Sequence, residues 1–186
     1  MKGYLTTITW CIINTCVAQI TYIPFKSTWK YLDDGSNQGT VWRTASFNDS
    51  AWKSGLGKFG YGITDANTII NFGPSQSKKY ITTYFRKTVS LSDPAQYSSF
   101  SLNIKRDDGV VVYINGVEAL RNNMPTGSVS YTTLAYNAAD NGSTTQSCTI
   151  KPSYFKLGEN LIAVEIHQAK ANSTDMAFDL ELKGRP

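Results

Sequence analysis

Hydrophobic and polar residues alternate with a period of two along several stretches of the chain. In residues 161–167 aliphatic side chains recur at every second position, and in residues 177–182 phenylalanine and leucine alternate with aspartate and glutamate. Residues 29–32 and 80–91 also read as strands, the second with long polar side chains on both faces. Successive side chains of a strand point to opposite faces of a sheet, so this period predicts strands. We expect about eight or nine strands in an all-β, antiparallel β-sandwich without a long helix.

The stretch 106–118 contains two turn signals with a strand between them. Asp108-Gly109 and Asn115-Gly116 are pairs in which aspartate or asparagine tolerates a positive φ and glycine adopts it freely. Between them, residues 110–114 are all β-branched or aromatic, which suits a buried strand. Together with the apolar residues on either side, the pattern predicts an antiparallel meander at the centre of the sandwich.

Glycines are frequent between residues 53 and 62, and Tyr61 lies between two of them. Such a segment is typical of a surface loop that its aromatic side chains pin down. A phosphate loop would need a Gly-Lys-Ser or Gly-Lys-Thr sequence after a strand, and this segment has neither. Tyr61 is therefore predicted to present an exposed ring.

The chain has 186 residues, enough for one domain with a full hydrophobic core. Aromatic residues are plentiful, with 11 Tyr, 8 Phe and 4 Trp, and Gly, Ser, Thr and Asn recur throughout. This composition is typical of a secreted β-protein that is rich in turns. The net charge of +4 comes from scattered basic residues without a basic run, so nucleic acid is not an expected partner.

The N-terminus has the pattern of a secretory signal peptide. Lys2 gives a positive start, residues 4–17 are mostly apolar and uncharged, and small residues precede a cleavage point after Ala18. We expect residues 1–18 to be removed and residues 19–186 to form one β-sandwich domain, secreted to the extracellular space or the cell surface. The alternative is that the apolar run forms the first strand of the domain. A membrane span is not expected, because the run is shorter than the ~20 apolar residues that cross a bilayer.

Only Cys148 of the three cysteines would remain after cleavage, so no internal disulfide is expected. The single histidine, His167, is far from Cys148 in sequence and is predicted to be a structural residue of a strand. With no second histidine and no cysteine pair, a tetrahedral zinc site is not expected.

A set of motifs occurs in an order and spacing that resemble a known family. The motifs are Phe47-x-Asp49-Ser50-x-Trp52, Gly60-Tyr61-Gly62, Tyr84-Phe85-Arg86-Lys87, Asp107-Asp108-Gly109-x-x-x-Tyr113-Ile114-Asn115-Gly116 and Gly158-Glu159-Asn160-x-Ile162-Ala163-Val164. Spread over residues 29–184, they resemble the galactose-binding-domain-like jelly roll. The set is similar to sugar-binding domains attached to β-galactosidases and related glycoside hydrolases, and closer still to accessory modules of secreted Bacteroidetes-type proteins. The resemblance implies a β-sandwich that often carries a structural Ca²⁺ and often binds carbohydrate, without implying catalysis.

Two acidic pairs, Asp33-Asp34 and Asp107-Asp108, lie in predicted turns. Paired carboxylates in loops are hard oxygen ligands that suit Ca²⁺. In the resembled fold a calcium ion often joins an early loop to the last strand, which implies a structural Ca²⁺ site made of Asp33 or Asp34 with Asp179 or Glu181. The alternative is that aspartate next to glycine only forms the turn.

Sugar binding needs an aromatic ring for the C–H face of a pyranose and polar groups for its hydroxyls. Tyr61 is the candidate for the ring, and Arg106, Asp107 and Asp108 share one loop from which they could hold hydroxyls. The spacing of Phe47 and Trp52 indicates a packed turn, so those two rings are expected in the core. Further rings available for such a platform are Trp29, Tyr31, Trp42, Tyr131 and Tyr136.

The first functional hypothesis is a secreted, non-catalytic module that binds a polysaccharide or another glycan. The second is a protein-interaction or spacer module that packs against neighbouring domains of a larger extracellular protein. The third is a weak glycoside hydrolase, because paired carboxyl groups about 5–10 Å apart can cleave a glycosidic bond. Both acidic pairs lie in glycine-terminated turns without pocket-forming helices, so we do not expect an enzyme.

Overall fold

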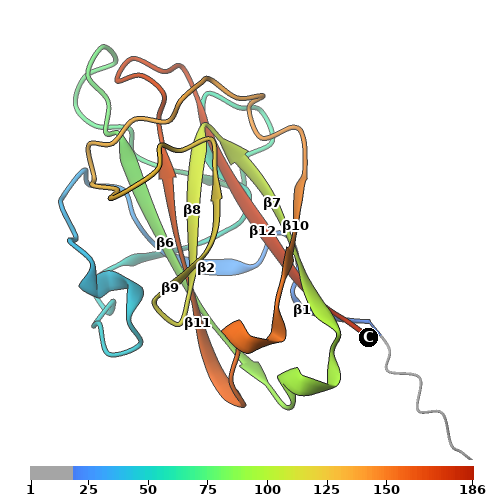
Figure 1. The fold of residues 1–186 in the computed structure, drawn as a ribbon. Helices are drawn as coiled ribbons and strands as arrows, with labels where there is room; N and C mark the ends of the chain where they lie inside the picture. The colour runs from blue at the N-terminus through green and yellow to red at the C-terminus, as the bar shows by residue number, and fades with distance from the viewer. Residues whose placement is uncertain (1–18) are drawn as a thin grey trace, which may run out of the picture.

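The computed structural model describes residues 19–186, which form two stacked β-sheets (Figure 1). Residues 1–18, which include the predicted signal peptide, lie outside the described residues. Each sheet contains six strands. The expected all-β sandwich is confirmed, although the described residues form twelve strands where about eight or nine were predicted.

We call the two sheets A and B. Sheet A contains β1 (Ile20–Ile23), β4 (Phe59–Tyr61), β5 (Thr68–Ile69), β7 (Ser99–Asp107), β10 (Gln146–Ile150) and β12 (Met176–Arg185). Sheet B contains β2 (Thr28–Leu32), β3 (Lys53–Leu56), β6 (Thr82–Leu91), β8 (Gly109–Ile114), β9 (Val117–Asn122) and β11 (Gly158–His167). Three short 3₁₀ helices connect some of them: η1 (Val41–Arg43), η2 (Pro94–Gln96) and η3 (Pro152–Tyr154). Neighbouring strands are antiparallel, apart from the parallel pair β4 and β5.

The glycine-rich segment is not the surface loop that the sequence predicted, because it forms β3 and β4. β3 pairs with β2 at the edge of sheet B, and β4 pairs with β12 in sheet A. A Cβ atom added to Gly60 would lie 2.3 Å from the carbonyl oxygen of Met176, and one added to Gly55 would lie 2.7 Å from the side chain of Thr68. These glycines therefore permit close packing of neighbouring segments.

The stretch 106–118 spans both sheets. β7 lies in sheet A and β8 in sheet B, so Asp108-Gly109 is a crossover between sheets and the prediction of a hairpin turn there was wrong. Asn115-Gly116 does form the predicted hairpin between β8 and β9, with φ of 52° at Asn115 and 87° at Gly116. Residues 110–114 are all buried, as their composition indicated.

Aromatic and aliphatic side chains fill the space between the sheets. Phe85 of β6 and Phe178 of β12 join the two sheets, with ring centroids 4.2 Å apart. Trp29 of β2 contacts Phe178 edge-on, with centroids 5.2 Å apart. All three side chains are at most 1% exposed. Full burial of a phenylalanine side chain stabilises the fold by about 1.5–3 kcal/mol.

A second apolar cluster covers the outer face of sheet B. The segment 40–52, which includes η1, and the segment 124–135 contribute to this cover. The ring of Trp42 lies 4.8 Å from that of Tyr84 and 5.8 Å from that of Tyr113. Trp52 packs in the same cluster at 7% exposure, which confirms its predicted place in a core.

Long loops gather at one end of the sandwich, at the top of Figure 1. They are residues 70–81, 123–145 and 168–175, and residues 107–109 cross between the sheets at the same end. We call this the loop end. The β8–β9 hairpin lies at the opposite end, which we call the hairpin end. Within residues 19–186, no helix has the length and apolar character needed to cross a membrane.

Candidate functional site

Asp108 lies at the crossover between the sheets, and its carboxylate ties two loops to it. The carboxylate oxygens accept hydrogen bonds from the backbone N–H groups of Ala139 and Ala169, each at 2.7 Å. The Asp108 carbonyl oxygen accepts bonds from Arg106 at 2.5 Å and from Asn123 at 3.1 Å. Since Asp108 is only 1% exposed, it positions the loops and does not meet the expectation of a side chain open to a ligand.

Asp107 is also closed to solvent, at 1% exposure. Its Oδ2 atom is buried and has no hydrogen-bond partner within residues 19–186. Burial, together with the carboxylates of Asp108 and Asp175, raises the pKa of Asp107 to about 8. These surroundings favour the protonated form of the carboxyl group, so Asp107 is not the charged, exposed hydroxyl partner that the sequence suggested.

Tyr61 does not present the exposed ring that was predicted. It is 6% exposed, and its ring packs against Phe72, with centroids 5.3 Å apart, and against the ammonium of Lys79 at 4.9 Å. Burial, followed by the nearby carboxylates, raises the pKa of its hydroxyl. A Cβ atom on Gly62 would lie 2.2 Å from the carbonyl oxygen of Thr174, so the flanking glycines serve close packing and do not display the ring.

Arg106 is the one predicted ligand-binding residue that reaches an open pocket. Its guanidinium donates to the carbonyl oxygen of Asp108 and to Oδ1 of Asn122, each at 2.5 Å. Burial lowers the pKa of the guanidinium from its usual value. It lines a cavity of about 300 Å³ at the loop end, which we call the Arg106 pocket. The other residues of this pocket are Asn123, Ala138, Ala139, Asp140 and Gln146.

An exposed aromatic residue adjoins the Arg106 pocket. Tyr136 is 62% exposed, and its backbone N–H donates to the carbonyl oxygen of Asn123, a pocket residue, at 3.0 Å. The side chain of Asn123 is held in turn by both backbone groups of Asn137. The pocket thus brings together a guanidinium, two amides and a carboxylate, which are groups that can hold sugar hydroxyls, and the exposed Tyr136 lies on the adjoining loop segment.

Sequence reasoning missed Asn123, Asp140 and Gln146 as site residues. Asn123 and Asp140 lie in polar loop segments, and Gln146 opens β10. Their polarity alone carried no signal, because many loop residues of this chain are equally polar. The hydrogen bonds of Asp108 to Asn123 and Ala139 hold residues 123–145 over the crossover, and the pairing of β10 with β7 places Gln146 opposite Ile104, close to Arg106.

The predicted calcium ligands do not come together. The carboxylate of Asp33 pairs with the ammonium of Lys53 at 2.8 Å and accepts the backbone N–H of Asn71 at 2.7 Å. Asp34 instead accepts the backbone N–H and the hydroxyl of Ser36. Asp179 accepts the backbone N–H of Lys26 with both oxygens, and burial raises its pKa. Within residues 19–186, no three acidic, histidine or cysteine side chains gather as a metal site would need, so these residues do not fit the expected ion.

The two acidic pairs also lack the access that a glycosidase needs. Asp33, Asp107 and Asp108 are each at most 3% exposed. A saccharide could not reach both carboxyl groups of either pair, so neither pair offers the acid and the nucleophile or base of glycoside hydrolysis.

His167 is held as a structural residue. It is fully buried, and its Nδ1 atom lies 2.8 Å from the carbonyl oxygen of Thr133 and 3.0 Å from the hydroxyl of Thr82. The neighbouring Glu165 accepts a hydrogen bond from the hydroxyl of Tyr113 at 2.7 Å. The contact between His167 and the carbonyl oxygen of Thr133 attaches the segment around Thr133 to sheet B.

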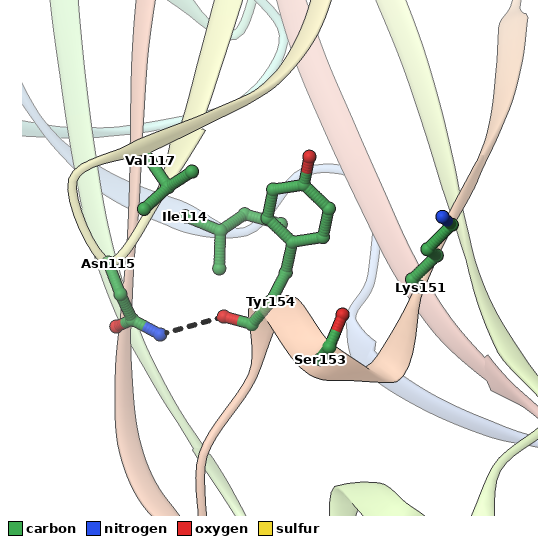
Figure 2. Close-up of a pocket in the computed structure, with 6 residues that line it drawn as sticks. All are labelled: Ile114, Asn115, Val117, Lys151, Ser153 and Tyr154. Atoms are coloured by element: carbon green, nitrogen blue, oxygen red, sulfur yellow. Dashed lines mark hydrogen bonds between the residues drawn. The ribbon is translucent and has the colours of Figure 1, made fainter.

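A larger cavity of about 510 Å³ lies at the hairpin end (Figure 2). In Figure 2 the ring of Tyr154 lies beside Ile114 and Val117, and Lys151 stands across the cavity. The amide of Asn115 donates to the carbonyl oxygen of Tyr154 at 3.1 Å. Asn115, for which the sequence predicted only a place in a turn, thus both forms the hairpin and lines the cavity.

The sequence matches no protein-family model and no curated protein. The fold, in contrast, is shared with solved glycoside hydrolases. A β-glucuronidase of Bacteroides uniformis matches 91% of this chain at 15% identity with a TM-score of 0.60. A β-glucuronidase from an uncultured Clostridium sp. matches 96% at 11% identity with a TM-score of 0.57. A calcium-binding mutant of B. uniformis β-glucuronidase 2 matches 91% at 16% identity with a TM-score of 0.56.

These similarities concern one part of each larger enzyme. The match covers 18% of each Bacteroides uniformis chain and 31% of the Clostridium chain. Identities this low establish a common fold and nothing about activity. The expected likeness to a β-sandwich domain of glycoside hydrolases is therefore confirmed as a likeness of fold.

Proposed function

We propose that this protein is a secreted, non-catalytic accessory module that binds a glycan at the Arg106 pocket. The observation that carries the proposal is the open pocket walled by guanidinium, amide and carboxylate groups, and the exposed Tyr136 on the adjoining loop is the ring we assign to it. The fold adds support, because its solved neighbours are glycoside hydrolases in which the matching part is a minor share of the chain.

Binding would use two kinds of contact. The face of a pyranose would pack on Tyr136, and its hydroxyls would exchange hydrogen bonds with Asp140 and Gln146. Arg106 already donates to two protein oxygens, so its main role would be to keep the pocket wall in place. Its remaining N–H groups could donate to sugar hydroxyls.

Isothermal titration of the purified protein against a panel of polysaccharides and oligosaccharides tests the proposal. We expect Tyr136→Ala to weaken binding of the responding glycan at least about tenfold, since a central aromatic contact commonly contributes that much. Gln146→Ala should weaken it less, because hydroxyl contacts can be replaced by water. Leu134→Ala is the matched control, since Leu134 lies on the same loop at 45% exposure. The proposal fails if no glycan binds, or if Tyr136→Ala binds as the unmodified protein does.

Secretion rests on the sequence of residues 1–18 alone. If that segment is a signal peptide, N-terminal sequencing of the exported protein should begin at Gln19. A mature protein that retains Met1 would exclude cleavage.

The second candidate function is packing against a neighbouring domain or protein. Exposed apolar side chains near the hairpin end favour it, since Val117 is 59% exposed and Leu157 is 73% exposed. Exposed apolar side chains of this kind are common where domains pack against each other. Failure of every glycan to bind in the titration above would favour this candidate.

A further inference from the structure

A pocket on the outer face of sheet B lies between η1, the β8–β9 hairpin and the loop that follows β9. Its cavity is about 310 Å³. The charged residues that line it are Arg43 of η1 and Glu118 and Arg121 of β9. We call it the Arg43 pocket. It shares no residue with the Arg106 pocket, so the two sites can be tested separately.

The strand register brings the charged residues of β9 to the same face as Tyr113, which also lines the pocket. Tyr113 of β8 pairs directly with Glu118, and Val111 pairs with Arg121. Directly opposed residues of an antiparallel pair lie on one face of the sheet. Val111 and Tyr113 both belong to the apolar cluster on the outer face, so the two charged side chains project from that face too. The guanidinium carbon of Arg43 lies 4.1 Å from the centre of the Tyr113 ring, which places it over the same face.

Glu118 and Arg121 neutralise each other. Nε and one terminal nitrogen of Arg121 donate to the two carboxylate oxygens of Glu118, at 2.8 Å and 2.7 Å. The other terminal nitrogen donates to the backbone carbonyl oxygens of Pro125 and Gly127. The bond from Arg121, with a smaller contribution from the charge of Arg43, lowers the pKa of Glu118. The pair therefore adds no net charge to the pocket, and Arg43 supplies the positive charge that remains.

Arg43 itself has no such partner. Within residues 19–186, no carboxylate oxygen lies within 4.0 Å of its guanidinium, and its buried Nε atom has no hydrogen-bond partner. Arg86, Arg106 and Arg121, in contrast, each donate to protein oxygens through at least two nitrogens. The Tyr113 ring stabilises the positive charge of Arg43 but offers no oxygen to its N–H groups. The half-buried Arg43 therefore keeps donors for a ligand.

We propose that the Arg43 pocket binds one singly charged anionic group of an acidic saccharide, a carboxylate or a sulfate ester, through the guanidinium of Arg43. A guanidinium donates two parallel N–H groups to such an anion, and one negative charge balances the one positive charge that the pocket carries. The hydroxyls of Thr40 and Ser128, which also line the cavity, would donate to the same group or to its sugar ring. That the ligand is a saccharide rests on the proposed function, whereas the charge it must carry follows from the pocket.

Isothermal titration with three ligands tests the proposal: an oligogalacturonate, a sulfated oligosaccharide and a neutral oligosaccharide of the same length. We expect an acidic ligand to bind more tightly than the neutral one, and the acidic ligand that does so identifies the anionic group. Arg43→Gln should weaken acidic binding at least about tenfold and leave neutral binding unchanged. Arg185→Gln makes the same change at an exposed arginine and is the matched control for general charge attraction.

A second variant separates ligand binding from a role of Arg43 in the fold. Arg43→Lys keeps a cation near the Tyr113 ring but loses the paired N–H donors of the guanidinium. It should therefore keep the melting temperature of the unmodified protein and still bind the acidic ligand more weakly. If Arg43→Gln does not fold, Arg43→Lys alone decides the outcome.

The proposal is overturned if neither acidic ligand binds more tightly than the neutral one, if the Arg43 variants bind it as the unmodified protein does, or if Arg185→Gln loses as much affinity. The two proposals fail separately. Acidic binding that depends on Arg43 and not on Tyr136 would stand even if the Arg106 pocket binds nothing. Glycan binding that depends on Tyr136 alone would overturn only the proposal for the Arg43 pocket.

Discussion

At the scale of single residues, burial decides what the acidic pairs can do. Asp107 and Asp108 are adjacent in sequence, yet their carboxyl groups have different surroundings. Asp108 is satisfied by two backbone N–H groups, while one oxygen of Asp107 is buried without a partner. A carboxyl group in that position is more stable protonated, which is why its pKa rises to about 8.

The raised pKa of Asp107 makes the stability of the protein depend on pH. The unfolded carboxyl group loses its proton near pH ~4, while the folded one keeps it up to about pH 8. Between those values the folded state binds more protons, so the free energy of unfolding should fall as the pH rises. Asp107→Asn should reduce the dependence of the free energy of unfolding on pH. Above pH 8 the variant should be more stable than the unmodified protein. Urea unfolding of both proteins at several pH values checks it, and a constant difference across the series would contradict it.

Residue types alone could not reveal which candidate side chains are accessible. The sequence pointed to Tyr61 because glycines flank it, but those glycines admit the backbone of residues 174–176 and leave the ring buried. Tyr136 was one of several available rings, and nothing local set it apart. Its exposure follows from how residues 123–145 fold over the crossover, which depends on contacts far apart in sequence.

At the scale of elements, the same type of turn dipeptide occurs in two different kinds of connection between strands. Asn115-Gly116 closes a hairpin within sheet B, whereas Asp108-Gly109 carries the chain from one sheet to the other. Both pairs tolerate tight turns, so local chemistry marks a change of direction without telling which strand comes next. Long alternating strands such as β6, β11 and β12 were predictable, because every second side chain must reach the core. The short strands β3, β4 and β5 have too few residues to show a period.

The turn before β11 depends on one buried asparagine. Asn160 is fully buried, and its amide oxygen accepts from the backbone N–H of Lys156 and from Asn115, each at 2.8 Å. Its amide nitrogen donates to the carbonyl oxygens of Lys156 and Gly158. It therefore fixes its own turn and also joins that turn to the β8–β9 hairpin.

Replacing Asn160 should destabilise the fold strongly. Asn160→Ala would leave several buried polar groups unpaired, so we expect a loss on the order of 2–4 kcal/mol in the free energy of unfolding. Leu157→Ala in the same turn is the control, because an exposed side chain should change stability by no more than about 0.5 kcal/mol. Chemical denaturation measures both variants, and equal effects would mean that the asparagine bonds do not hold the turn.

At the scale of the whole molecule, the sandwich was predictable and the position of its candidate pocket was not. Two sheets follow from alternating strands that each need a covered face. The Arg106 pocket draws on β7, β10 and the loop between β9 and β10. A site assembled from separate segments leaves no continuous motif, which is why the sequence identified Arg106 alone among the residues of this pocket.

The calcium site implied by the resemblance also depends on bringing separate segments together. Asp33 and Asp179 do not share such a site, because each carboxylate has its own partners within the protein. The ammonium of Lys53 balances the negative charge of Asp33. The carboxylate oxygens of Asp179 accept hydrogen bonds from the backbone N–H groups of Lys26 and Leu180. We therefore expect neither added Ca²⁺ nor a chelator to change the melting temperature. An ion that bound only the folded state would raise it by mass action, by an amount that grows with concentration. Differential scanning calorimetry of the untagged protein with Ca²⁺, with Mg²⁺ and with chelator measures the effect. A rise specific to Ca²⁺ would contradict the expectation and would require a site built largely from backbone oxygens.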